Sequence, residues 1–253
     1  MSQALQIRSA LAAEQLPAPS QAWLQSVISQ QPAQQRSLPA LVASAKARLL
    51  ATDLTASGMF DSASQPPGFL REVLSPQAAS VQETRLAQDV VVQVVDMENL
   101  SQSRWQQVQA LEAIERGEQK RGREIIRIPV GGEEGGEGGD EAGAESSRPG
   151  TGRQLASAAN NAPSDAFSTH RLVLQDAAGN TLFALELTRI HRISISRLHI
   201  GEKLVLKAGT VVARGTLLLE PASIKFLGGQ VETMHKTWLD GRLKRLREAA
   251  QAA

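Results

Sequence analysis

The side chains that most often carry out chemistry in proteins are few and scattered in this sequence. The four histidines, His170, His191, His199 and His235, show neither the His-x-His nor the i,i+4 spacing that brings two ligands onto one metal ion. Cysteine is absent, which excludes disulfides, cysteine-ligated metals and thiol nucleophiles. We therefore expect no metal site and no catalytic cysteine.

Motifs for covalent catalysis and for nucleotide binding are also missing. No serine stands in the Gly-x-Ser-x-Gly setting of a nucleophile elbow, and the chain has no phosphate-binding Gly-x-x-x-x-Gly-Lys loop. The glycine pairs within residues 131–139 alternate with acids and have the composition of a linker. The sequence thus predicts a protein that is not an enzyme and has no cofactor.

Binding of single-stranded nucleic acid needs exposed aromatic side chains and a basic groove. Aromatic residues make up 3% of the chain and its net charge is +1. Phe183 and Phe226 share strand parity with aliphatic residues, so we expect both in the core. Basic residues cluster at 116–127 and at 242–247. Each cluster could contact phosphates weakly or could simply be the solvated surface of a helix. The first cluster could also pair with the acidic insert that follows it.

The first quarter of the chain has the pattern of short amphipathic helices. Helices are expected over residues 3–15, 21–30 and 38–56, each with apolar residues at helical spacing. Ser20 is placed to cap the second helix. Short helices joined by short loops favour a small bundle.

The remainder of the chain has the alternation of short strands. A first strand at residues 89–95 precedes a helix at 102–116, and further strands follow at 171–175 and 181–190. After a connector, the stretch GEKLVLKAGTVVARGTLLLEPASIKFLGG supplies the closing strands, of which 203–207 is the first. Five short strands in this order match an OB-fold barrel.

Residues 131–165 contain glycine, acids and small polar residues and have too little apolar surface to offset the entropy of ordering, so we expect this tract to be disordered. The fold class expected is therefore α+β: an N-terminal helical bundle, a five-stranded OB-fold barrel with a long disordered insertion between strands 1 and 2, and a C-terminal helix. The 253 residues include no apolar run of the length that crosses a membrane and no secretory signal at residues 1–14.

The expected domains divide the chain into four parts. Residues 1–56 form the bundle and residues 57–84 a linker. Residues 85–229 form the OB-fold, with its insertion at about 98–165, and residues 230–253 form the terminal helix.

Four blocks of the chain resemble one family, the Rmi subunit of the complex between RecQ helicase and topoisomerase III. They are PSQAWLQSVIS with LLATDL, SQSRWQQVQAL, LVLQDAAGNTLFALEL, and GEKLVLKAGTVVARGTLLLEPASIKFLGGQVE. The combination LLLEP with IKFLGG is the most specific of them. The chain ends after one barrel and so is similar to the short, fungal-type members, for which the small partner subunit of the larger members is not expected.

The resemblance implies a non-catalytic scaffold in the nucleus that binds topoisomerase III and a RecQ-family helicase. Such a subunit modulates strand passage to dissolve double Holliday junctions in homologous recombination, DNA repair and replication. It binds DNA weakly or through the complex, and it has no membrane partner. The chain contains no tyrosine, so any phosphotyrosyl adduct of strand cleavage must form on a partner.

The resemblance also implies a set of residues that contact topoisomerase III. One lies at the start of a strand in the fourth block, and the others form an aromatic-containing stripe in the second. They are Lys203, Ser101, Gln102, Trp105, Val108 and Leu111.

Without the resemblance, both residues also have a purely structural interpretation. Trp105 could pack on the barrel, and Lys203 could be an ordinary lysine at the start of a strand. The alternative function is an OB-fold module that binds single-stranded DNA directly.

Overall fold

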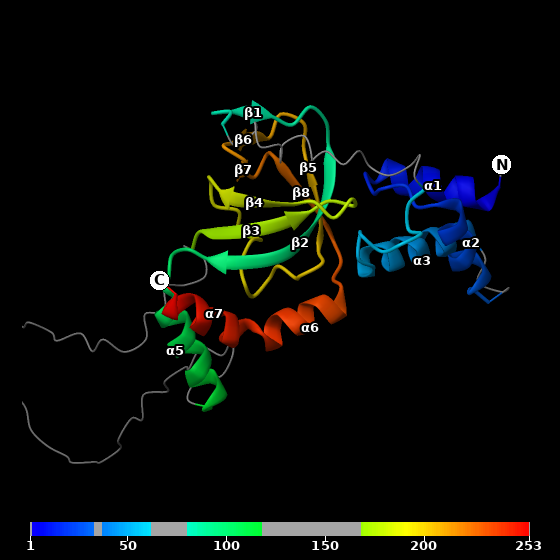
Figure 1. The fold of residues 1–253 in the computed structure, drawn as a ribbon. Coiled ribbons are helices and arrows are strands. Elements are labelled where there is room, and N and C mark those ends of the chain that lie inside the picture. The colour runs from blue at the N-terminus through cyan, green and yellow to red at the C-terminus, as the bar shows by residue number, and fades with distance from the viewer. Residues whose placement is uncertain (1, 33–36, 62–79, 118–167, 253) are drawn as a thin grey trace, which may run out of the picture.

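The computed structural model describes residues 2–32, 37–61, 80–117 and 168–252 (Figure 1). The tract expected to be disordered, 131–165, lies outside these residues, and so does most of the expected linker. The described parts form a helical region, a curled sheet and a group of C-terminal helices. The predicted fold class is confirmed at this level.

The helical region consists of α1 (Gln3–Ala13), α2 (Gln21–Ser29) and α3 (Leu38–Ala51). Ser20 caps α2 as predicted, because its hydroxyl accepts the N–H of Trp23 at 3.1 Å. The third helix was expected to reach residue 56, but it ends at Ala51. Asp53 there accepts the N–H of Thr55 at 2.8 Å, a local turn that competes with another helical turn.

The sheet contains eight strands in the order β1-β6-β7-β4-β3-β2-β5-β8. Neighbours are antiparallel except for β4 and β7, which are parallel. The strands are β1 (Thr84–Arg85), β2 (Val90–Asn99), β3 (His170–Gln175), β4 (Thr181–Glu186), β5 (Lys203–Leu206), β6 (Val211–Ala213), β7 (Thr216–Leu219) and β8 (Ile224–Gly228).

The long strand β2 connects the two halves of the sheet. Its first half pairs with β5 and its second half with β3, and the register shifts between Val94 and Asp96. Just before it, Leu86 donates its N–H to the carbonyl of Thr210 at 2.9 Å, which ties the start of this segment to the far edge of the sheet. The register shift bends the strand, and the sheet curls around its core.

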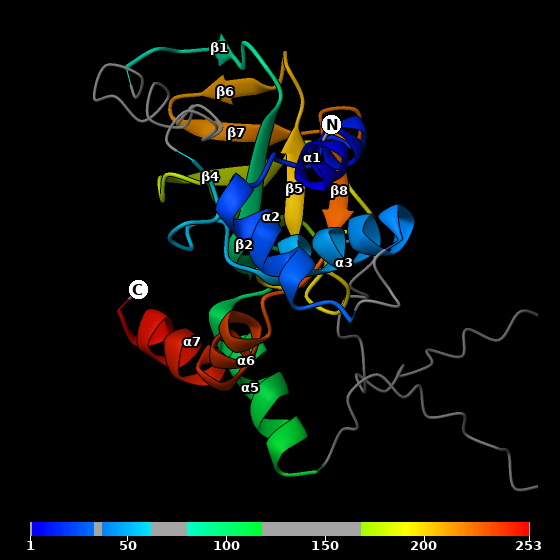
Figure 2. The ribbon, with the colours of Figure 1, turned by 90° about the vertical axis from the view of Figure 1, so that its right-hand side faces the viewer.

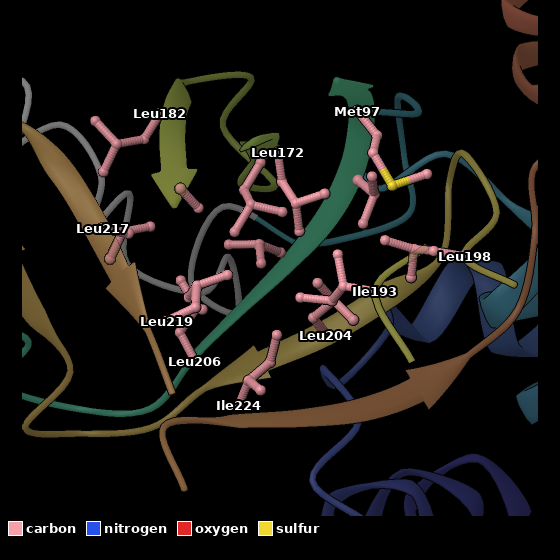
Figure 3. Packing of buried hydrophobic residues seen from close by; sticks show 14 of the residues in the cluster. Met97, Leu172, Leu182, Ile193, Leu198, Leu204, Leu206, Leu217, Leu219 and Ile224 are labelled. Atoms are coloured by element: carbon pink, nitrogen blue, oxygen red, sulfur yellow. The ribbon is translucent and has the colours of Figure 1, made fainter. Parts of the chain in front are cut away.

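The core inside the curled sheet is aliphatic (Figure 3). Val90, Val92 and Val94, which alternate along β2, are buried, and so are Leu217 and Leu219 of β7. Leucines from the other strands meet them, namely Leu172, Leu174, Leu182, Leu204 and Leu206. Alternating residues of these strands therefore form the core.

Three predicted elements were too long. Within the closing stretch, residues 210–220 were expected as a strand interrupted at 213–215; they form the hairpin β6–β7, because Arg214 and Gly215 both adopt positive φ, at 48° and 76°, in a tight turn. The strand expected over residues 181–190 ends at Glu186. The single C-terminal helix is two, α6 (Glu232–Asp240) and α7 (Arg242–Gln251), separated at Gly241, a weak helix former.

The three helices α5 (Arg104–Glu115), α6 and α7 form a group beside β2, apart from the helical region (Figures 1 and 2). Trp238 of α6 anchors this group, because its indole N–H donates to Asp96 of β2 at 2.6 Å. The pair of α5 and α7 is joined by an ion pair between Arg247 and Glu112 at 2.7 Å. The helix predicted at residues 102–116 is thus folded against the C-terminal helices.

Candidate partner-binding surface

The corner between β2 and α5 is held by a set of local hydrogen bonds. Asn99 is buried, and its side-chain oxygen accepts the N–H of Ser101 at 2.8 Å. The amide of Gln107 reaches back and donates to the Asn99 carbonyl at 3.0 Å. Ser103 and Gln106 form a capping box that starts α5. These bonds fix the direction in which α5 leaves the sheet.

The corner presents two large apolar side chains to solvent. Leu100 is 45% exposed and Trp105 is 54% exposed. Leu100 also donates its N–H to the carbonyl of Thr169, and Thr169 donates to the Ser101 hydroxyl at 2.8 Å. The exposed side chains therefore belong to an ordered corner, which is the setting that an interface anchor requires.

The predicted stripe along α5 divides between surface and interior. Trp105 is exposed, whereas Val108 is 1% exposed and packs inside the protein. Leu111 and Gln102 are half-buried, and Ser101 is exposed with its hydroxyl engaged by Thr169. Of this predicted set, the large side chain that a partner can reach is Trp105.

Lys203 lies in the interior of the described chain. Its side chain is fully buried, and Nζ donates to the carbonyls of Leu50 at 3.1 Å and Gly201 at 2.7 Å. The carbonyl of Leu50 belongs to the last turn of α3, where carbonyls lack helical partners and attract cations. In the structure Lys203 thus joins the helical region to the sheet, and its predicted contact with topoisomerase III stays a prediction.

Burial lowers the pKa of Lys203 to about 8, although the nearby charge of Asp53 acts in the opposite direction. Burial would raise the pKa of Asp53, but hydrogen bonds from Thr55 and Gln93 and the charge of Lys203 outweigh that effect and lower it. Gln93 is itself fully buried; it accepts the N–H of Leu54 at 3.0 Å and donates to Asp53 at 2.7 Å and Gln175 at 2.9 Å. We call Asp53, Gln93 and Lys203 the polar junction.

The strand β4 faces the opposite way from the prediction. Phe183 was expected in the core but is 48% exposed, and Leu182 and Ala184 are buried instead. The reason lies at the end of the strand, where Glu186 points inward. Its carboxylate accepts the N–H groups of His170 at 2.7 Å and Ile190 at 2.9 Å and contacts the His170 ring at 3.0 Å. Because both faces of β4 are apolar, hydrophobic alternation could not reveal this inward polar residue.

Phe226, the second phenylalanine expected in the core, is partly buried and packs against it. The guanidinium of Arg192 lies 4.9 Å from the centre of its ring. This position agrees with the predicted core role.

The outward face of β4 continues the exposed corner. Since β2 and β4 are both antiparallel to β3, their C-terminal ends lie at the same edge of the sheet. Leu100 follows β2 and Leu187, 60% exposed, follows β4. Phe183 lies beneath Arg171, whose guanidinium is 4.8 Å from the centre of its ring. We call Leu100, Trp105, Phe183 and Leu187 the apolar face.

A charged group joins the two parts of the apolar face. Glu98 of β2 pairs with Arg104 at 3.4 Å and with Arg171 at 2.5 Å. Arg104 immediately precedes Trp105, and Arg171 covers Phe183. The apolar face thus has charged residues between its two parts.

The sequence contained weak signals for the residues that it failed to identify. Gln93 interrupts a run of valines, VVVQVV, and a polar residue inside such a run marks a buried hydrogen-bonding site. Leu100 follows a strand and has no periodic pattern, and Leu187 alternates with Phe183 on a face of β4 that pattern alone does not assign, so the exposure of both depends on tertiary structure. Within the described residues no cluster of three potential ligands for a metal ion occurs, and no helix has the length and hydropathy needed to cross a membrane.

Two family models match the chain. The model described as the RMI1 N-terminal OB-fold domain matches residues 71–242, and that of the RMI1 N-terminal helical domain matches residues 11–57. The OB-fold match covers more than half of the chain and includes the apolar face together with Gln93 and Lys203 of the polar junction.

A curated relative agrees with these matches. The RecQ-mediated genome instability protein 1 of Schizosaccharomyces pombe (strain 972 / ATCC 24843) is 28% identical over 173 residues, which cover 68% of this chain and 69% of the relative.

Proposed function

The chain belongs to the RMI1 family, and we propose that it is a non-catalytic nuclear subunit that binds topoisomerase III and a RecQ-family helicase. In that complex it modulates strand passage so that double Holliday junctions are dissolved and the genome stays stable. The observation that carries the proposal is the apolar face, which places four large apolar side chains in solvent at one ordered edge of the OB-fold.

The apolar face has the features of a docking site for the topoisomerase. Tryptophan at the centre of an interface often contributes more binding free energy than any of its neighbours, and Trp105 is more than half exposed. Leu187 and Phe183 extend the apolar contact along β4, and Arg171 covers the Phe183 ring and offers a polar contact between the two parts of the face. Docking here would remove from water the large apolar side chains that the isolated chain leaves exposed.

The described chain resumes beside this face after residues 118–167. The described chain stops at Gly117, just after α5, and resumes at Ser168, next to Thr169 and its bonds to the corner. A topoisomerase bound to the apolar face would therefore lie within reach of this segment. We propose that the segment biases the DNA gate of the enzyme, which requires that it bind one gate state more tightly than the other.

The docking proposal is tested by co-elution of the purified chain with the topoisomerase III of the same organism. The wild type is expected to form a one-to-one complex. Trp105→Glu and Leu187→Glu should each weaken it by about 30-fold or more, since loss of an interface anchor costs about 2 kcal/mol or more. Leu5→Glu is the matched control, because Leu5 is 55% exposed on α1, away from the apolar face. Failure of the wild type to co-elute, or equal weakening by the control, would contradict the proposal.

The role of the inserted segment is tested separately. A variant in which residues 118–167 are replaced by a short glycine-serine linker retains α5 and should still co-elute with the topoisomerase. It should change decatenation by the complex. Unchanged decatenation would remove the segment from the mechanism while leaving the docking proposal intact.

The alternative function is a module that binds single-stranded DNA by base stacking on the barrel. The exposed ring of Phe183 is the observation in its favour. Arg171 covers that ring, however, and stacking proteins use successive aromatic side chains along the strand. Tight DNA binding that Phe183→Ala abolishes, together with no topoisomerase complex, would favour this alternative.

A further inference from the structure

The strands β4, β6 and β7 have an outer side that none of the described helices covers (Figures 1 and 2). The helical region lies beside β5 and β8, and the group of α5, α6 and α7 lies beside β2. Successive side chains of a strand point to opposite sides of the sheet. On β7, Leu217 and Leu219 are buried in the core, and Leu218 between them is half-buried on the outer side.

The register of the strands places an apolar row across this outer side. Leu185 of β4 pairs with Leu218 of β7, and Leu218 pairs with Val211 of β6. All three side chains are half-buried. Because directly opposite residues of neighbouring strands have Cβ atoms about 5 Å apart, the three side chains form one contiguous apolar surface. We call Leu185, Leu218 and Val211 the outer strip.

The outer strip is continuous with the apolar face. Leu185 alternates with Phe183 and Leu187 along the chain and therefore lies on the same side as these two exposed residues. A stable protein interface of standard size takes about 20–30 residues and about 800 Å² of surface from each partner. The four side chains of the apolar face are too few for that size, and the outer strip is the adjoining apolar surface.

Arg214 stands at the end of this surface, in the turn between β6 and β7. Its φ of 48° lies in the left-handed region, which in two-residue hairpin turns is usually occupied by Asn, Asp or Gly. Its side chain is exposed, and no hydrogen bond or ion pair joins that side chain to another residue of the described chain. An unfavourable backbone conformation at a residue whose side chain has no use within the fold points to a function outside it.

We propose that the outer strip and Arg214 extend the docking site for topoisomerase III beyond the apolar face. This inference rests on the proposed function and adds the residues that the enzyme covers on β4, β6 and β7. The matching surface of the enzyme is apolar opposite the outer strip and carries a carboxylate opposite Arg214. A guanidinium can bind a carboxylate through two parallel hydrogen bonds, and arginine is enriched among the residues that dominate interface affinity.

The first test is the affinity of the full chain for topoisomerase III after Arg214→Gly. Glycine favours positive φ, so this variant should fold, and its urea midpoint should equal or exceed that of the wild type. It should bind about tenfold more weakly, and the loss should shrink between about 50 and about 300 mM salt, since salt screens ion pairs. Lys225→Gln is the control, because it removes an exposed cation of β8 that donates to Gln15 of the helical region. It should change the affinity less than about twofold.

The second test is Leu218→Glu, which places a charge in the outer strip. Binding should weaken at least about tenfold at both salt concentrations, because the lost contact is apolar. Ile28→Glu is the control, since Ile28 is also half-buried but lies on α2 in the helical region. Urea unfolding of both variants checks that they fold, and Arg214→Gly decides the matter if Leu218→Glu does not.

The outcomes separate this inference from the proposed function. Wild-type affinity in Arg214→Gly and in folded Leu218→Glu, with binding still lost in Trp105→Glu, would overturn the inference and leave docking at the apolar face intact. Failure of the wild type to bind would overturn both. Self-association of the free chain that Leu218→Glu abolishes, without weakening of the topoisomerase complex, would assign the outer strip to a second copy of the chain.

Discussion

The polar junction has polar side chains in the interior, whereas the apolar face has large apolar side chains in solvent, which is the reverse of the usual distribution in a folded protein. At the junction, Gln93 and Lys203 are fully buried, whereas Trp105 and Leu187 on the apolar face are more than half exposed. The buried groups have their hydrogen-bond partners within the chain, from Leu50, Gly201, Asp53 and Leu54. The exposed apolar groups are left largely uncovered by the residues that the structure describes.

This contrast assigns different roles to the two regions. A buried polar group is costly unless it is hydrogen-bonded, so the hydrogen bonds of the junction fix the arrangement of the helical region and the sheet. An exposed apolar group adds little to the stability of the isolated chain and is available to a partner. Substitutions at the junction should therefore change the stability of the chain, and substitutions on the apolar face should change binding.

The largest loss of stability is expected from Gly229→Ala. Gly229 has a φ of 89°, and an added Cβ would overlap the carbonyl oxygen of Leu50 in α3 and lie 2.7 Å from the Leu50 Cβ. The strain of positive φ and the overlap with backbone should together destabilise the protein by about 4 kcal/mol. Urea unfolding measures this, and amide exchange should show faster opening of α3.

Gly228→Ala is the matched control for that substitution. Its φ is 87° and an added Cβ meets nothing within 4 Å, so it carries the backbone strain alone, about 1–2 kcal/mol. Equal losses in the two variants would show that the contact between Gly229 and α3 does not hold the two regions together.

The next effect is a pH dependence that comes from Lys203. Its pKa is about 8 in the folded protein, whereas in the unfolded chain the same group has the ordinary lysine pKa of 10.5. Between these values the unfolded chain binds more protons, so stability should rise with pH from about 8 to about 10.5, by up to about 3 kcal/mol. Lys203→Met should abolish this component of the rise, as measured by urea unfolding at several pH values. A wild-type slope retained by the variant would show that the buried lysine is not its source.

Gln93→Leu should destabilise the protein by about 2 kcal/mol. The substitution removes the acceptor of the Leu54 N–H and the donor to Asp53 and Gln175, and leaves these groups without that partner. Gln175→Leu removes one of the same bonds from a half-buried side chain and should cost less than about 1 kcal/mol. A smaller loss for Gln93→Leu than for Gln175→Leu would contradict the central place of Gln93 in the junction.

The sequence predicted the fold better than it predicted the site. Helices, strands and the aliphatic core follow from local periodicity, and Val92 and Leu217 lie where alternation put them. The reversal of β4 was missed because Phe183 and Leu182 are both apolar, and the choice between the two faces depends on bonds that Glu186 makes with His170 and Ile190. Those bonds join positions from different strands and loops, so no local pattern encodes them.

The same reason explains why the burial of Lys203 was not predicted. A lysine at the start of a strand carries no sign of burial, because its partners, the carbonyl of Leu50 and the charge of Asp53, lie in the helical region, far away along the chain. By contrast, the family resemblance predicted a partner contact for Trp105; this side chain is exposed, and the contact stays a prediction. Contacts between distant parts of the chain could not be predicted from the sequence.

The smallest effect on stability is expected at the apolar face. Leu187→Glu replaces a side chain that is 60% exposed, so the free energy of unfolding should change by less than about 0.5 kcal/mol. Leu219→Ala, on β7 nearby, truncates a fully buried side chain and should cost about 3 kcal/mol under the same conditions. Urea unfolding of the isolated chain distinguishes the two. A loss near that of Leu219→Ala would show that Leu187 supports the fold itself, and the weakened topoisomerase binding of its variant would then no longer be evidence for docking at the apolar face.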